Sequence, residues 1–149
     1  MKKIIAVDFD GTITKKPTFP DAPTPEDIAD HCAEVLQRLH KAGCTIILNT
    51  CRRGPKLADA LRYCKEQSIP LDYVNENASE AICFYDGDCR KIFADYYIDD
   101  MNLGGFPGWL EAERIIMGVD NERLPEICSC GGKCKTEELR DVLDMGRCD

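Results

Sequence analysis

The chain has 149 residues, of which 27 are acidic and 19 are basic, so its formal net charge at pH 7 is −8. This length is sufficient for one compact domain with a buried core. The acidic balance disfavours a broad nucleic-acid-binding surface, because neutralising phosphates requires clustered lysine and arginine side chains. No apolar run reaches the roughly 20 residues of a membrane span, and Asp8 and Asp10 interrupt the first apolar stretch too early for a signal peptide. We therefore expect a cytoplasmic protein without a membrane partner.

The N-terminal third of the chain predicts a strand, a loop and a helix. Residues 3–8 form a continuous apolar run, which is typical of a buried strand. Residues 11–25 contain four prolines and predict a loop. A helix is expected from Thr24 to Gly43, because Thr24 can cap it, Pro25 suits its first turn and apolar side chains then recur at helical spacing.

The remaining elements continue this alternation. Strands are predicted at residues 44–48, 71–74 and 94–98, and helices at 55–67 and 109–117, with a polar segment from 75 to about 90. The order predicts a Rossmann-like, doubly wound α/β fold, a three-layer sandwich around a mainly parallel sheet. We expect residues 1–117 to form this domain and residues 118–149 to be an appended tail with a short helix over 137–145.

Paired acids follow two of the predicted strands. Asp8 and Asp10 come after the first strand, and Asp99 and Asp100 come after the last. Ligands bind at the carboxyl ends of strands in parallel sheets, so these side chains should converge. Two unit charges about 4 Å apart repel by about 4 kcal/mol at an effective dielectric constant near 20. Such a cluster requires a cation, and an all-oxygen ligand set favours Mg²⁺ together with a phosphate.

Four segments in order resemble the motifs of the haloacid dehalogenase (HAD) superfamily. They are Asp8-Phe9-Asp10-Gly11-Thr12, Leu48-Asn49-Thr50, Lys91, and Tyr97-Ile98-Asp99-Asp100. The resemblance covers residues 3–117, about three-quarters of the chain. Most members of this superfamily are phosphohydrolases, so the resemblance implies a Mg²⁺-dependent phosphatase acting on phosphate monoesters.

The resemblance also implies a role for each residue. Asp8 would be the nucleophile that forms an aspartyl-phosphate, and Asp10 the general acid and base. Thr50 would bind a phosphoryl oxygen, although a threonine before Pro55 also suits helix capping. Lys91 would neutralise the phosphate, with the alternative that it is one of a solvated pair with its neighbouring arginine.

The expected metal ligands are the carboxylates of Asp8 and Asp99 and the backbone carbonyl of Asp10, with Asp100 in support. Gly11 would let the chain turn sharply beside the substrate. Arg52 either grips phosphate bidentately or is an exposed structural arginine. The expected substrate-binding residues are thus Gly11, Thr50, Arg52 and Lys91.

Neither gap between the motifs is long enough for a separate cap domain, so the resemblance implies a small capless member with an open site. Such a site suits a phosphate on a large molecule or small phosphates bound with little discrimination. Phe19 or the polar segment before Lys91 could supply a partial lid. A phosphatase specific for nucleotides or nucleic-acid ends is an alternative, with Lys15, Lys16, Arg52 and Arg53 lining one groove. A phosphate-binding or interaction protein without turnover is another, although the intact Asp10 argues against it.

The chain has ten cysteines, which we expect to be free thiols in a reducing compartment. Those at positions 32, 44, 51, 64 and 83 lie in apolar or helical stretches, where cysteine is a small buried hydrophobe. Cys128, Cys130, Cys134 and Cys148 could together bind zinc. Their spacing lacks paired C-x₂-C knuckles, however, so a cysteine-rich tail without metal is the favoured interpretation.

Overall fold

The computed structural model describes residues 2–118, and within them four strands form one sheet. The strands are β1 (Ile4–Val7), β2 (Thr45–Leu48), β3 (Tyr73–Val74) and β4 (Tyr96–Ile98). Their order is β3-β2-β1-β4, and every neighbouring pair is parallel. The predicted α/β fold with a parallel sheet is therefore confirmed.

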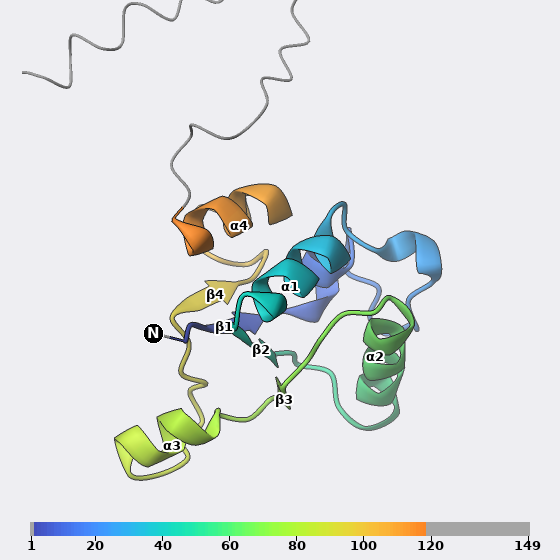
Figure 1. The fold of residues 1–149 in the computed structure, drawn as a ribbon. Helices are drawn as coiled ribbons and strands as arrows, with labels where there is room; N and C mark the ends of the chain where they lie inside the picture. Colours follow the sequence, from blue (N-terminus) through green and yellow to red (C-terminus); the bar gives the residue numbers. More distant parts are fainter. Residues whose placement is uncertain (1, 119–149) are drawn as a thin grey trace, which may run out of the picture.

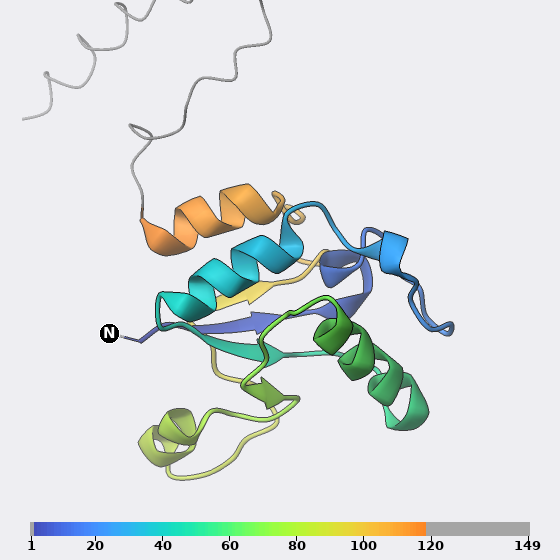
Figure 2. The ribbon, with the colours of Figure 1, turned by 45° about the vertical axis from the view of Figure 1, so that its right-hand side comes forward.

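Helices cover both faces of the sheet, which gives three layers (Figures 1 and 2). The helices are α1 (Cys32–Lys41), α2 (Gly54–Glu66), α3 (Ser79–Tyr85) and α4 (Trp109–Met117). Helices α1, α2 and α4 share the larger buried cluster with Ile5, Val7 and Leu48. The opposite face of the sheet, with Ile4 and Ala6, packs in a second cluster that includes Ala78, directly before α3. Period-two alternation along β1 thus sends its side chains into two separate cores.

The helix predicted from Thr24 begins only at Cys32. Thr24 does cap a turn, but that turn is a short 3-10 helix, η2 (Pro25–Asp27). Ile28 then forms an isolated antiparallel β-bridge with Thr14, and the Ala29 N–H donates to Ile13 O at 2.8 Å. These backbone groups bond to the preceding loop, so they cannot join the helical ladder. The prediction for residues 28–31 was therefore wrong.

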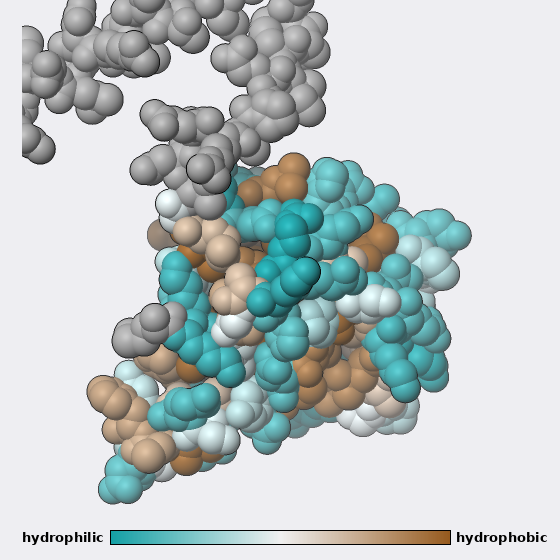
Figure 3. Space-filling view, viewed as in Figure 1, coloured by the Kyte–Doolittle hydropathy of each residue, from teal (hydrophilic) through white to brown (hydrophobic). Residues whose placement is uncertain are grey.

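Helix α3 lies in the polar segment between residues 75 and 90, for which no helix was predicted. The side chain of Asn77 joins the two ends of this segment. It donates to Asp88 Oδ1 at 2.9 Å and to Cys89 O at 3.0 Å, and it accepts from the Phe93 N–H at 2.7 Å. Hydrophobic surface gathers over α3 (Figure 3). Phe84 of this helix is 79% exposed.

Three of the five cysteines expected to be buried, Cys32, Cys44 and Cys64, are buried, whereas Cys51 and Cys83 are exposed. None of the described helices is both long enough and apolar enough to cross a bilayer. The predicted zinc ligands and the predicted tail helix lie outside the described residues.

Candidate active site

The carboxyl ends of three strands lie level at one edge of the sheet. Val7 is in register with Leu48 of β2 and with Ile98 of β4. The Asp8 N–H donates to Ile98 O at 2.9 Å, and the Asn49 N–H donates to Val7 O at 2.8 Å. The chain runs outward from β1 to β3 and returns to β4 on the other side, so β1 and β4 flank the topological switch point. Ligands bind at such points in open α/β sheets.

Asp8, Asp99 and Asp100 come together there. Each offers a carboxylate oxygen, and these oxygens lie within 4.8 Å of one another. The pKa of Asp8 is raised to about 7. Burial is the largest cause and the charges of Asp99, Asp100 and Asp10 add to it, while a hydrogen bond from the Phe9 N–H opposes the rise. Three oxygen ligands with mutual repulsion fit a hard divalent cation.

Gly11 allows this convergence. Its φ is +82°, a left-handed conformation that favours glycine, and a Cβ at this position would overlap the Asp100 carboxylate. Thr12 fixes the same turn: its hydroxyl accepts from the Asp100 N–H at 3.0 Å, and its carbonyl accepts from Trp109 Nε1 at 3.0 Å. The turn after β1, the turn after β4 and the start of α4 are thereby tied together.

Asp10 points to a different partner, Arg52. Arg52 Nε donates to Asp10 Oδ2 and Arg52 Nη2 donates to Asp10 Oδ1, both at 2.7 Å. The Thr18 and Phe19 N–H groups also donate to Asp10 Oδ1, at 2.9 and 3.1 Å. Burial alone would raise the pKa of Asp10, but the hydrogen bonds from Arg52, Thr18 and Phe19 outweigh it and lower the pKa.

The structure differs from both expectations for Arg52. Only 1% of its side chain is exposed, and its guanidinium is engaged by Asp10, Thr18 and Asp21 rather than free to grip a phosphate. The bidentate pair with Asp10 joins residues 42 positions apart, so no local spacing in the sequence indicates it. Thr18, which binds both partners of this pair, is likewise a residue that sequence reasoning missed.

Thr50 lies in the turn after β2, beside the end of β1. Its hydroxyl accepts from the Arg52 N–H at 3.2 Å, and its own N–H donates to Asn75 Oδ1 at 2.7 Å. Both bonds shape the turn that carries Arg52 toward Asp10.

Lys91 is not brought to the carboxylates. It precedes β4, at the end of the sheet opposite Asp99, and the adjacent Ile92 packs in the cluster that contains Ile4 at the start of β1. Lys91 is exposed and lines a cavity with Tyr85 and Phe93. The expectation that Lys91 shields Asp8 therefore does not match its position.

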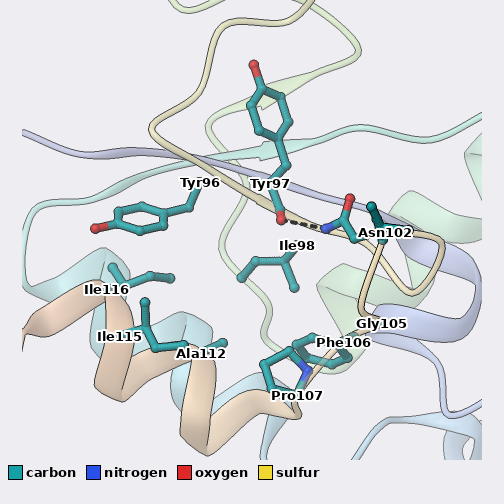
Figure 4. Close-up of a pocket in the computed structure, with 11 residues that line it drawn as sticks. Tyr96, Tyr97, Ile98, Asn102, Gly105, Phe106, Pro107, Ala112, Ile115 and Ile116 are labelled. Carbon is teal, nitrogen blue, oxygen red and sulfur yellow. Dashed lines mark hydrogen bonds between the residues drawn. The ribbon is translucent and has the colours of Figure 1, made fainter.

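A separate apolar cavity of about 410 Å³ lies between β4 and α4 (Figure 4). Tyr96, Phe106 and Ile116 contribute to its wall, and Asn102 Nδ2 donates to Tyr97 O at 2.9 Å along its rim. The described residues that line it include no acidic side chain. The cavity is therefore distinct from the carboxylate cluster.

The chain resembles two solved structures. A conserved protein from Bacteroides thetaiotaomicron is 30% identical, with a TM-score of 0.69, over 79% of this chain and 92% of that chain. The cobalt-bound deoxy-D-mannose-octulosonate 8-phosphate phosphatase from Haemophilus influenzae is 16% identical, with a TM-score of 0.42, over 78% of this chain and 88% of that chain. No protein-family model matches the chain, and no curated protein matches it.

Proposed function

The chain belongs to the same family as the conserved Bacteroides thetaiotaomicron protein, and we propose that it is a metal-dependent phosphatase of the HAD superfamily. The observation that carries this proposal is the convergence of Asp8, Asp99 and Asp100 at the switch point, with Asp10 held two residues beyond Asp8. These four acids also belong to the first and last of the four segments that carry the resemblance in sequence, so those two motifs and the geometry support one site.

The reaction would proceed in two displacements. An Asp8 carboxylate oxygen attacks phosphorus, the bond from phosphorus to the ester oxygen breaks, and Asp10 gives that oxygen a proton. Asp10 then takes a proton from a water molecule, whose oxygen attacks the aspartyl-phosphate and releases phosphate and the free Asp8 carboxylate. Because Arg52 holds Asp10 as a carboxylate, the free protein is prepared for the second step, and Asp10 must gain its proton before the first.

We propose Mg²⁺ as the cation. The carboxylates of Asp8 and Asp99 and the backbone carbonyl of Asp10 would hold it, with Asp100 in support, and when bound it would neutralise charge on the phosphate. The chain's own contribution is to place these acids: Gly11 admits the Asp100 carboxylate, and Thr12 fixes the Asp100 backbone.

We further propose that the site is uncapped. The described chain has only a loop and a short turn in residues 14–31, and only α3 with its flanking loops in residues 75–95. Neither segment is long enough to fold alone. An open site accepts a phosphate on a large leaving group as well as on a small one.

Release of inorganic phosphate from a panel of phosphate monoesters, with Mg²⁺ present, tests the proposal. The comparison is between the wild type, Asp8→Asn, which keeps the shape but cannot attack phosphorus, and Asp30→Asn, a control at an exposed carboxylate. We expect Asp30→Asn to match the wild type and Asp8→Asn to lose at least about a hundredfold in rate. Phosphate binding without release by the wild type would instead identify a binding protein.

A further inference from the structure

Phe19 is hydrogen-bonded to Asp10 through its backbone, and its aromatic ring lies over Arg52 and is open to solvent. Its backbone N–H donates to Asp10 Oδ1 at 3.1 Å, and 60% of the residue is exposed. One side of the ring faces the guanidinium of Arg52, with Cζ 5.7 Å from the ring centroid. Arg52 Cζ also lies 5.0 Å from the centroid of the buried Phe9 ring. The guanidinium thus contacts both rings by cation–π interaction, and of the two rings only Phe19 is exposed.

Hydrogen bonds fix the loop that carries this ring. Arg52 Nη2 donates to Thr18 Oγ1 at 2.8 Å, and Arg52 Nη1 donates to Asp21 O at 3.2 Å. The Thr18 N–H donates to Asp10 Oδ1 at 2.9 Å. Residues on both sides of Phe19 are therefore anchored to the buried guanidinium or to Asp10. A ligand that stacks on the ring has little loop ordering to offset, which favours binding.

The proposed chemistry sets which part of the substrate meets Phe19. Asp10 must reach the ester oxygen that leaves phosphorus, so the leaving group lies on the Asp10 side of the site. Phe19 carries an exposed aromatic ring, and its backbone N–H donates directly to Asp10 Oδ1. Exposed aromatic rings bind nucleobases by stacking, and removing such a ring weakens binding by about 5- to 150-fold per base.

We infer that Phe19 is a stacking platform for a planar ring in the leaving group, and that the substrates are nucleoside monophosphates; this inference rests on the proposed phosphatase function. A nucleobase at the end of an oligonucleotide has the same stacking chemistry. The net charge of −8 favours the mononucleotide, because a polyanion would be repelled without clustered basic residues to neutralise it.

A matched pair of substrates measures how much the Phe19 ring contributes to recognition of the base. Adenosine 5′-monophosphate and ribose 5-phosphate carry the same ester on the same sugar carbon and differ in the base. We expect kcat/KM for the nucleotide to exceed that for the sugar phosphate by about 5- to 20-fold in the wild type, at the lower end of the stacking range because one face of the base is covered. Phe19→Ala should remove this preference and keep turnover of ribose 5-phosphate, and Phe19→Trp should keep the preference.

Phe84→Ala is the control, since Phe84 is an exposed phenylalanine on α3, away from Asp10, and should leave both rates unchanged. Equal kcat/KM for the two substrates in the wild type would overturn the inference, as would an equal loss on both substrates in Phe19→Ala, which indicates a structural role. A 5′-phosphorylated oligonucleotide preferred over the mononucleotide would overturn the mononucleotide assignment. If the wild type released phosphate from none of the three substrates, the nucleotide, the sugar phosphate and the oligonucleotide, the phosphatase function itself would be in question. That result differs from phosphate release without a preference for the nucleotide.

Discussion

Replacing Asp8 by asparagine should stabilise the metal-free protein above pH 7, although it removes catalysis. In the folded protein the pKa of Asp8 is raised from 3.8 to about 7, mainly by burial and then by neighbouring carboxylates. Between these two pH values the folded state keeps a proton that the unfolded state has lost. Stability from this group is therefore complete below about pH 4 and is lost as the pH rises to about 7. An asparagine is uncharged at every pH, so the variant does not lose stability in this way.

The magnitude follows from the same pKa values. At about 1.4 kcal/mol for each pKa unit, a rise from 3.8 to about 7 corresponds to about 4 kcal/mol without solvent screening. Asp8 is only partly buried, so screening by water reduces the expected gain to about 1–2 kcal/mol. For a domain of this size, that is a rise in Tm of about 3–6 °C.

Chemical unfolding in EDTA at pH 4 and at pH 8.5 measures this effect. We expect the stability difference between Asp8→Asn and the wild type to be small at pH 4 and larger at pH 8.5, and Asp30→Asn to show no such trend. Mg²⁺ at pH 8.5 should stabilise the wild type and not Asp8→Asn, since it binds the folded site. A difference that does not change with pH, or a variant less stable at pH 8.5, would refute the electrostatic reasoning.

Three further substitutions probe the site. Gly11→Ala should cut activity by at least about tenfold, because the new methyl group displaces the Asp100 carboxylate; wild-type kinetics would disprove the close approach. Arg52→Ala should lower the free energy of unfolding by about 3 kcal/mol or more, because it leaves Asp10 partly buried without its partner. Equilibrium unfolding by urea measures this loss, and a value below about 1 kcal/mol would contradict the expectation. Asp99→Ala should weaken Mg²⁺ binding in calorimetry more than Asp100→Ala, and the reverse order would exchange their roles.

Local patterns in the sequence were sufficient for the sheet and for the acid cluster. Short apolar runs identified all four strands, and the rule that ligands bind at the carboxyl ends of parallel strands predicted that Asp8 and Asp99 would meet. These features depend on residue type and order alone. They do not require knowledge of the path of any loop.

Features that depend on loop path were not predictable. The bridge between Thr14 and Ile28 ends the predicted helix early, although the cap at Thr24 forms as expected. The pairing of Arg52 with Asp10 spans two loops that approach only in the folded chain. Tertiary contacts decided both of these cases. Lys91 matched a motif by its order in the sequence, but it precedes the strand predicted at 94–98, and it therefore lies at the end of the sheet opposite Asp99.

The proposed reaction requires that Asp8 becomes phosphorylated during turnover. Mass spectrometry of acid-quenched protein, after incubation with Mg²⁺ and adenosine 5′-monophosphate, detects this phosphorylation. Asp10→Asn should accumulate phosphate on the peptide that contains Asp8, because the water that hydrolyses the intermediate is no longer activated, and Asp8→Asn should carry none. Release of phosphate by the wild type, with no phosphorylated Asp8 in either the wild type or Asp10→Asn, would contradict the covalent mechanism.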